Sequence, residues 1–534
     1  MKKLPLGIQN FREIIEENHV YVDKTMYVHK LITEGKSYFL SRPRRFGKSL
    51  LLDTIAEVFR GNKELFKGLW IYDSDYDFKS YPVLKLDLSN VDNSTPAVFK
   101  KSLINLLRRR ARDEGVEIGD ETPADSFTDL IEGMYGQYNQ KVVVLIDEYD
   151  VPILDHITEI ETAEANRDIL RGIFKALKSL DSHIKFIFFT GVSKFTRTSI
   201  FSSLNNVADI TMLKKYSDIC GIPIGELDYY FGDHIKNLEA KKVFESHFDI
   251  RETILAWYDG YSWNSETKLL NPYALLSFFH SEEIKSFWYV SGSPKFLIDL
   301  IKKSPESVPK LQNPIISERD MDAVDLANLD ITSLLFQTGY LTVSKVVYIR
   351  ATPAYELEIP NLEVREAFFT SITAGLTENR HDVASGAFRQ IDTALSSGDM
   401  QTILKVLRSL FSSIPYQLHI NAEAYYHSIF YAVMNVLGFK IHAEMSVSMG
   451  RIDAVLELGD KVYVFEFKYK HCPPDADEDK KRKLSAKALE IGMKQLKEKG
   501  YADKFVGSGK TVYQAVFAFL GRSNVEMLID SSML

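Results

Sequence analysis

The sequence predicts an α/β protein built of an N-terminal domain around a parallel sheet, a helical middle region and a C-terminal domain of the order αβββαβ. Three observations lead to this prediction. Residues 142–146 form an uninterrupted run of Val, Leu and Ile, which is typical of a parallel strand buried on both faces. From about residue 223 the pattern becomes helical and rich in aromatic side chains. In residues 413–534, runs with a strand period alternate with runs with a helix period.

The composition narrows the class of protein. A chain of 534 residues has room for about three or four domains, and 45% hydrophobic with 26% charged residues is ordinary for a globular protein. The two cysteines suit a reducing compartment, and we find neither a signal-peptide core nor an apolar run of the roughly 18 residues that a membrane span needs. We therefore expect a cytoplasmic protein without a membrane partner. With a net charge of −8, nucleic acid would have to bind at local basic patches.

The central strand, residues 142–146, ends in the acidic residues Asp147 and Glu148. Open α/β sheets bind their ligands at the carboxyl ends of such strands. In nucleotide-hydrolysing enzymes the two acids have separate roles, so Asp147 would hold Mg²⁺ and Glu148 would orient or deprotonate the attacking water. A buried strand that ends in a solvated turn is the alternative, and a phosphate loop upstream distinguishes the two.

Three Gly-Lys-Ser/Thr triplets begin at positions 35, 47 and 509. A phosphate loop has to follow a strand and open a helix, because main-chain N–H groups and the helix N-terminus hold the anion. Only the triplet at position 47 meets this condition, with a helix predicted over residues 50–59. Lys48 would then contact the terminal phosphates, and the Ser49 hydroxyl would bind Mg²⁺. The further residues that we expect to contact the nucleotide are Arg44, Arg45, Phe46, Gly47 and Thr190.

The loop departs from the usual motif at its first position. Arg42 stands where the motif has Gly, and Pro43 follows it. Without the Gly the chain loses a residue that adopts positive φ freely. The cationic side chains of Arg42, Arg44 and Arg45 either compensate by their charge or bind something other than a nucleotide.

The remaining elements complete the predicted domains. Strands over residues 83–88, 185–190 and 208–212 give a sheet of about five strands, and residues 21–25 either close over the base or form an ordinary strand and turn. A hairpin between two helices, near residues 340–360, predicts a winged-helix-like lid. We expect a P-loop domain over residues 1–222, a helical and winged-helix-like region over 223–375, a helical connector over 376–412 and the C-terminal domain over 413–534.

The C-terminal domain carries a second group of acids. Glu466 and Lys468 are two positions apart in the predicted strand 461–470, so they share a face, and Asp453 in the neighbouring strand 451–458 is within reach of it. Asp453 and Glu466 would hold Mg²⁺ or Mn²⁺ through oxygen, while Lys468 would orient water or stabilise the transition state. A surface ion pair without a function is the alternative.

At residues 42–50, 21–25 and 145–150 the sequence resembles a bacterial and archaeal family that fuses an AAA-ATPase-like domain to a C-terminal PD-(D/E)XK nuclease-type domain. The resemblance extends over essentially the whole chain, and the C-terminal order of elements is similar to the restriction-endonuclease-like core. Ile452 stands where the motif name has Pro. The resemblance implies that Glu423, on the first helix of this core, supports the metal, and that Gln495, on the second, is a further active-site residue.

Together these features predict a nucleotide-regulated, metal-dependent nuclease that uses ATP and Mg²⁺ or Mn²⁺ and acts on nucleic acid, with DNA favoured. A non-cleaving ATP-binding switch that recruits a partner or nucleic acid is the alternative from another class, and Arg42 motivates it. A nuclease whose ATPase module is degenerate is a third possibility. The sequence leaves open a homo-oligomer, the strandedness of the substrate and the choice between DNA and RNA.

Overall fold

The structure is a computed structural model, in which the chain folds into two compact units. It describes residues 1–194, 207–244, 249–291, 298, 300, 311, 313–321, 330–377, 381–412, 432–433, 435, 453–470, 472, 477–498, 509–520 and 524–533. Unit 1 contains residues 1–296 and 313–363, and unit 2 contains residues 297–312 and 364–534. Among the described residues, no helix has the length and apolar character needed to cross a membrane. The two cysteines, Cys220 and Cys472, are buried free thiols.

The core of unit 1 is a five-stranded parallel sheet of the order β2-β3-β4-β1-β5. Its strands are β1 (Ser37–Ser41), β2 (Val83–Asp87), β3 (Val142–Asp147), β4 (Ile184–Gly191) and β5 (Ala208–Asp209). Strand β3 lies between β2 and β4, and every one of its residues is buried. The predicted α/β class with a central, doubly covered parallel strand is therefore confirmed.

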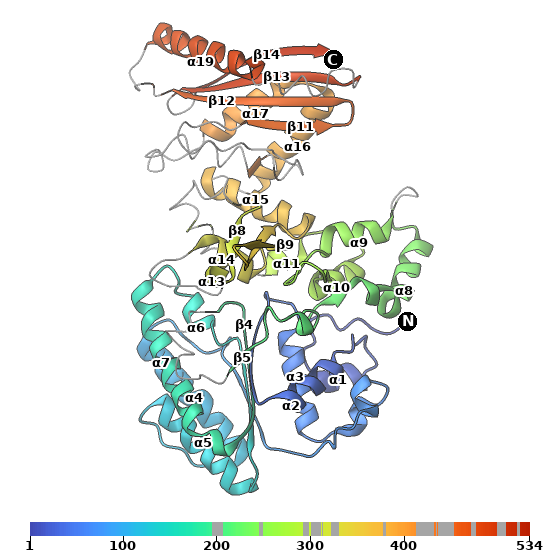
Figure 1. Ribbon diagram of the computed structural model, residues 1–534, viewed down its shortest axis with the longest axis vertical. Coiled ribbons are helices and arrows are strands. Elements are labelled where there is room, and N and C mark those ends of the chain that lie inside the picture. The colour runs from blue at the N-terminus through green and yellow to red at the C-terminus, as the bar shows by residue number, and fades with distance from the viewer. Residues whose placement is uncertain are drawn as a thin grey trace. The chain divides into compact units, whose positions relative to one another are not determined.

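Helices cover both faces of this sheet (Figure 1). On one face lie α4 (Pro96–Glu114), α5 (Pro123–Tyr138) and α7 (Ile160–Ser179), and on the other lie α1 (Phe11–Glu16), α2 (Thr25–Glu34) and α3 (Lys48–Phe59). A short helix, α6 (Val151–Leu154), follows β3. The described residues of this part also form the 3₁₀ turns η1 (Lys63–Phe66), η2 (Trp70–Asp73), η3 (Asp181–His183) and η5 (Lys214–Tyr216). Helices α4 and α5 begin sharply, because Thr95 and Thr122 cap them and a proline occupies the first turn of each.

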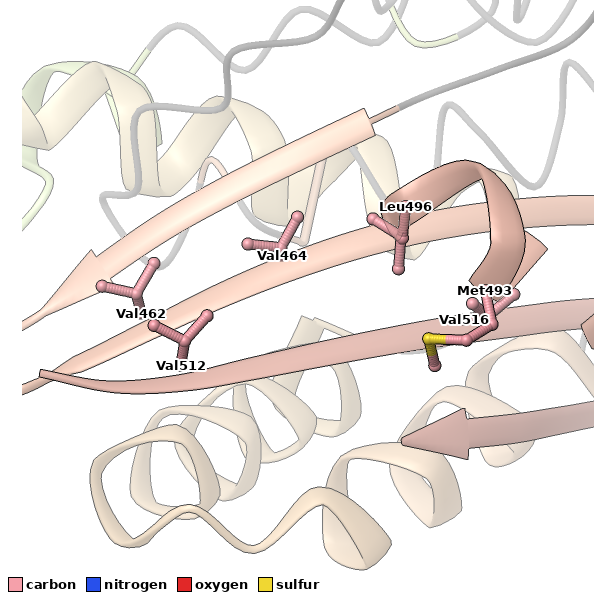
Figure 2. Close-up of a cluster of buried hydrophobic side chains, with 6 residues drawn as sticks. All are labelled: Val462, Val464, Met493, Leu496, Val512 and Val516. Atoms are coloured by element: carbon pink, nitrogen blue, oxygen red, sulfur yellow. The ribbon is translucent and has the colours of Figure 1, made fainter. Parts of the chain in front are cut away.

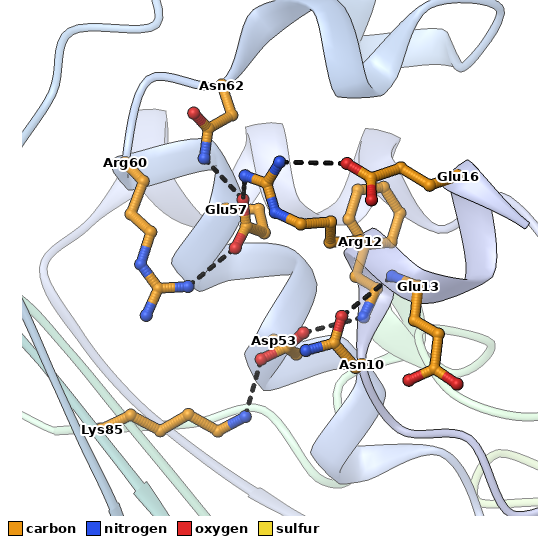
Figure 3. Close-up of polar contacts among 10 residues, drawn as sticks. Asn10, Arg12, Glu13, Glu16, Asp53, Glu57, Arg60, Asn62 and Lys85 are labelled. Atoms are coloured by element: carbon orange, nitrogen blue, oxygen red, sulfur yellow. Dashed lines mark hydrogen bonds and ion pairs between the residues drawn. The ribbon is translucent and has the colours of Figure 1, made fainter.

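Two buried acids fix helix α3, which leads out of the phosphate loop (Figure 3). The Asp53 carboxylate accepts hydrogen bonds from Phe11 N at 2.8 Å and from Lys85 Nζ at 2.8 Å. Glu57, one turn later, accepts from three side chains, which are Arg12, Arg60 and Asn62. Helix α3 is thereby tied to α1 and to strand β2, so the element that carries the loop has a fixed position.

The rest of unit 1 is helical, with a small antiparallel sheet of the order β8-β10-β9. The helices are α8 (Ile224–Lys241), α9 (Ile250–Tyr258), α10 (Pro272–Ser281), α11 (Phe287–Ser291), α13 (Glu318–Met321) and α14 (Ile331–Thr338). The strands are β6 (Ile222–Pro223), β7 (Leu269–Leu270), β8 (Ile315–Ser317), β9 (Thr342–Ile349) and β10 (Thr352–Glu358). The order α14, β9, β10, α15 (Leu362–Thr377) is the predicted helix, hairpin, helix.

Unit 2 contains a mixed sheet of the order β11-β12-β13-β14. Its strands are β11 (Asp453–Leu458), β12 (Lys461–Lys470), β13 (Thr511–Leu520) and β14 (Asn524–Met533). Strands β12 and β13 are parallel, and the two outer pairs are antiparallel. Strand β14 was not predicted, whereas the predicted helix 422–437 and strand 440–446 lie almost entirely outside the described residues.

Helices cover both faces of this second sheet as well (Figure 1). Helix α19 (Glu478–Glu498) lies on one face, where Met493 and Leu496 pack against valines of β12 and β13 (Figure 2). Helices α16 (His381–Ser397) and α17 (Met400–Ser412) lie on the other. The face under α19 is therefore a dry core at its valine end.

Candidate functional sites

The phosphate loop lies between β1 and α3, and two of its residues have positive φ. These are Arg45 at +62° and Gly47 at +94°, and Gly47 caps helix α3. Arg42, which replaces the usual Gly, is not among the residues with positive φ. The geometry of this loop therefore does not need a glycine at its first position.

The Lys48 ammonium lies in the middle of the loop. It donates hydrogen bonds to Arg42 O and Pro43 O, both at 2.9 Å, and its side chain is buried. These carbonyls hold the lysine where a terminal phosphate would exchange for them, because an ammonium has three donors and phosphate oxygens are stronger acceptors.

The guanidinium of Arg42 points away from the loop and into the protein. It is fully buried, stacks on Trp263 at 3.9 Å and donates hydrogen bonds to the carbonyls of Ser41, Thr211, Tyr216 and Ser217. Burial lowers the pKa of Arg42 to about 10, so it is still charged at neutral pH. Arg42 therefore connects the loop to the segment after β5 through hydrogen bonds. Of the three arginines of the loop, only Arg44 and Arg45 are exposed at its surface.

The acids that end β3 lie beside this lysine. Thr190 Oγ1 donates a hydrogen bond to Asp147, and both side chains are buried. Glu148 has φ of +51°, a strained value for a residue with a side chain. Burial raises the pKa of the Glu148 carboxyl, and the neighbouring Lys48 opposes that rise. A carboxylate whose pKa is raised toward neutral pH is a stronger base, so it accepts a proton from water more readily.

A third acid, Asp150, has a structural role that the sequence did not indicate. It is fully buried, and its Oδ2 accepts hydrogen bonds from Val192 N at 3.0 Å, Ser193 N at 2.6 Å and Ser193 Oγ at 2.9 Å. Burial raises the pKa of Asp150, and the bonds from Ser193 oppose the rise. This carboxylate joins the end of β3 to the end of β4, so it fixes the edge where Asp147 and Thr190 meet.

A cavity of about 360 Å³ opens over the loop. Most of the predicted nucleotide contacts line it, namely Arg44, Arg45, Phe46, Gly47, Lys48, Ser49 and Glu148. Asp147 and Thr190 are not among the lining residues, since they are buried behind this wall. Tyr273 on α10 also lines the cavity, and the Arg45 guanidinium lies 5.0 Å from its ring centre. No feature of the sequence predicted Tyr273 at this site.

A smaller apolar pocket of about 90 Å³ adjoins the same loop at Gly47. Val20, Tyr21 and Val22 line one side of it, and Phe231 lines another. An apolar pocket beside a phosphate loop suits a flat, weakly polar group such as a nucleobase. This places part of the segment 21–25 beside the pocket that a base would enter.

In unit 2, Glu466 and Lys468 lie on one face of β12. Glu466 is fully buried and pairs with the Lys468 ammonium. Phe467 lies on the opposite face, stacked on Phe517. Asp453 is the direct partner of Glu466 in the antiparallel register of β11 and β12, and directly opposite positions belong to the same face of a sheet. The three positions therefore converge in the backbone register.

One carboxylate oxygen of Glu466 has no partner. Its Oε2 is buried without a hydrogen bond in the described structure, as is Oε1 of Gln495 on α19. A buried, unpaired carboxylate oxygen is costly unless something fills its coordination, so this position fits an oxygen-bound divalent cation. Within the described side chains, no three His, Cys, Asp or Glu residues form a metal-binding group. The side chain of Asp453 and the whole of Glu423 lie outside the described residues.

A phosphate loop after β1 and the acid-ended strand β3, which β4 separates from β1 in the same sheet, define unit 1 as carrying an ATPase-like domain, and the mixed sheet with Glu466 and Lys468 has the character of a nuclease core. Comparison with known families agrees. The family model described as a predicted AAA-ATPase matches residues 5–201, and the PD-(D/E)XK nuclease superfamily model matches residues 421–527. A relative from Azotobacter chroococcum mcd 1, described as an uncharacterized protein in the vnfD 5' region, is 35% identical over 538 residues, which is 99% of each chain. The chain belongs to the family that joins these two domains, and the predicted resemblance is confirmed.

Proposed function

We propose that this protein is a metal-dependent nuclease, with DNA as the favoured substrate, whose activity ATP regulates through the N-terminal domain. The unpaired, buried Oε2 of Glu466 beside the Lys468 ammonium carries the proposal. A family match supports a nuclease domain, and the geometry supports a working site rather than a degenerate one. A stray surface ion pair would not be fully buried with one oxygen unpaired. A cytoplasmic location is part of the proposal.

The proposed roles in unit 2 follow from the charges of the residues. Asp453 and Glu466 would hold Mg²⁺ or Mn²⁺, which when bound polarises the phosphodiester and activates water. Glu466 positions the Lys468 ammonium through their ion pair, so Lys468 can orient water or stabilise the extra negative charge of the transition state. Gln495 supplies an amide from α19, and Glu423 would support the metal from the first helix of the core.

In unit 1, Lys48, Arg44 and Arg45 would bind the ATP phosphates, while Ser49 and Asp147 would hold the Mg²⁺ that accompanies ATP. Glu148 would accept the proton of the attacking water, because burial already raises the pKa of its carboxyl. Thr190 contacts Asp147 directly, so it would register whether the metal is bound. The apolar pocket lined by Tyr21 and Val22 would take the base.

The first experiment compares cleavage by the full-length wild type, Asp453→Asn and Lys468→Ala. Labelled single-stranded and duplex DNA and RNA are offered with Mg²⁺ or Mn²⁺, with and without ATP. We expect both variants to lose about 10²-fold or more in rate, the usual contribution of one such group. Lys470→Ala is the matched control, since Lys470 is the next lysine on that face of β12 and is exposed. Equal cleavage by the wild type and Lys468→Ala would refute the assignment.

The second experiment tests regulation with Glu148→Gln. We expect ATP binding to persist, ATP turnover to fall and the ATP dependence of cleavage to change. Cleavage that is indifferent both to ATP and to this substitution would leave a nuclease with an ATPase module that plays no part in cleavage.

The alternative hypothesis of a non-cleaving switch was based on Arg42, which stands where the phosphate-loop motif has Gly. In the structure Arg42 needs no positive φ, and its carbonyl helps to hold Lys48. The substitution is therefore compatible with a complete phosphate loop, and the nuclease remains the better-supported proposal.

A further inference from the structure

A second basic cavity lies at the opposite end of the unit 1 sheet from the phosphate loop. It has a volume of about 550 Å³, and four lysines line it: Lys36, Lys79, Lys141 and Lys185. Lys36 directly precedes β1 and Lys141 directly precedes β3, while Lys185 is the second residue of β4. The cavity therefore lies at the amino ends of these strands. The five-residue strand β1 separates it from the phosphate loop by about 17 Å, so one nucleotide cannot occupy both.

The lysines of this cavity are held in place by neighbouring groups. The ammonium groups of Lys79 and Lys185 lie 5.5 and 5.4 Å from the centre of the same ring, that of Tyr81. Cation–π contact of this kind fixes a flexible lysine without neutralising its charge. Lys36 donates to Asp181 O at 2.7 Å and Asp181 Oδ1 at 2.5 Å. Three of the four lysines, Lys36, Lys79 and Lys185, are thus held by neighbouring groups.

Negative charge is scarce around these lysines. No Asp or Glu is among the described residues that line the cavity, and Asp181 pairs with Lys36 beside it. Four lysines against Asp181 and Asp77, which accepts a hydrogen bond from Lys79 N at 3.1 Å, still leave a local excess of positive charge in a chain whose net charge is −8. The lining also contains Asn139 and Gln140, whose amide NH₂ groups are neutral hydrogen-bond donors. Like charges gathered in this way repel one another, so a polyanion that binds here gains both attraction and relief of repulsion.

We propose that this cavity, the four-lysine site, binds the phosphate backbone of a nucleic acid strand. Lysine ammoniums contact phosphates as point charges and carry no base preference. Several such charges along an open depression match successive phosphates better than a single anion. The site goes beyond the proposed nuclease function, because it adds a holding surface on the ATPase-like domain that cleavage chemistry does not require.

The test is the salt dependence of binding in the full-length protein. A fluorescein-labelled oligonucleotide, single-stranded or duplex, is titrated by anisotropy with EDTA present so that nothing is cleaved. Each phosphate contact contributes about −0.7 to the slope of log K against log [NaCl] for a single strand, and about −0.9 for a duplex. For the triple variant Lys79→Gln, Lys141→Gln, Lys185→Gln, we expect the slope to fall in magnitude by about 2 for a single strand and about 3 for a duplex.

The matched control removes the same charge elsewhere. Lys100, Lys101 and Lys175 are exposed lysines of α4 and α7, and their change to Gln is expected to leave the slope within about 0.5. A slope that falls equally in both triples, or in neither, overturns the proposal. Thermal unfolding of each variant verifies that it is folded.

A competition experiment with inorganic pyrophosphate distinguishes a site for nucleic acid from a site for small anions. If inorganic pyrophosphate stabilises the wild type through these lysines while the oligonucleotide slope is the same in wild type and variant, the site takes small anions and the proposal fails. All binding is measured without divalent metal, so the outcome is independent of whether the C-terminal site cleaves.

Discussion

Restoring the usual first glycine of the phosphate loop, by Arg42→Gly, is expected to damage the protein. The guanidinium donates to Ser41 O at 2.8 Å, Thr211 O at 3.0 Å, Tyr216 O at 3.2 Å and Ser217 O at 3.4 Å. Removing it takes a donor from each of these carbonyls, of which Tyr216 O keeps its bond from Ile219 N at 3.3 Å, opens a cavity and removes the stacking on Trp263. The loss of one partner from a buried charged cluster costs on the order of 3–5 kcal/mol. Some of the desolvation cost of the charge is recovered, so we expect the variant to be about 3 kcal/mol less stable.

The assay is urea unfolding of wild type and variant, followed by tryptophan fluorescence, with ATP binding measured by calorimetry. We also expect weaker ATP binding, since the Arg42 carbonyl that holds Lys48 is no longer anchored. Arg45→Gly is the matched control in the same loop. Glycine removes the strain of a positive φ at this position, which stabilises the variant, but the exposed contact of Arg45 with Tyr273 is lost, which destabilises it. The two free-energy changes are of similar size, so the stability of the variant should stay within about 1 kcal/mol of wild type. An Arg42→Gly protein as stable as wild type, with tighter ATP binding, would refute the reasoning.

Two further substitutions, the second with a matched control, test other parts of the chain. Burial raises the pKa of Glu363 from its ordinary 4.5 to about 8. The unfolded chain loses this proton first as the pH rises, so stability falls between about pH 4.5 and 8, by at most about 5 kcal/mol. Glu363→Gln should flatten that part of the stability–pH curve, and an unchanged curve would contradict the assignment. In unit 2, a Cβ on Gly492 would lie 2.4 Å from Val516 Cγ1 and 3.3 Å from Lys468 Cγ, so Gly492→Ala should cost about 1–3 kcal/mol and slow cleavage. Gly136→Ala, in a helix with open space, should gain up to about 1 kcal/mol, and equal unfolding midpoints for the two alanine variants would argue against close packing at Lys468.

The parts of the fold that the sequence predicted are those with a strong local signal. Strand β3 was predictable because a strand covered on both faces has to be apolar at every position. The phosphate loop was distinguished from the triplets at positions 35 and 509 by its context of strand and helix. Strand β14 was missed because its central residues are followed by Asp530 and two serines, which weakens the strand pattern, and its place comes from main-chain pairing with β13.

The role of Arg42 could not be predicted for a different reason. The motif suggested a lost positive φ, yet the positive φ values fall at Arg45 and Gly47. Three of the four acceptors of the guanidinium come from residues about 170 positions later, and local sequence carries no information on such contacts. Tyr273, Trp263 and Trp288 are comparable, since their aromatic character indicated packing but not packing against the phosphate loop.

The middle region of unit 1 packs against the phosphate loop, which its aromatic composition alone did not reveal. Trp288 Nε1 donates to Arg44 O at 2.8 Å, and a Cβ on Gly339 would lie 2.6 Å from Pro43 Cγ. A phosphate that takes the place of Arg42 O and Pro43 O around Lys48 would break the two hydrogen bonds between the lysine ammonium and this stretch of backbone. Trp288 on α11 donates to the main chain of Arg44, and Gly339 at the end of α14 lies beside the Pro43 ring, so we expect a shift of the loop to displace both. Under the proposed regulation by ATP, α11 and the end of α14 would be the first elements of unit 1 to respond to a bound phosphate.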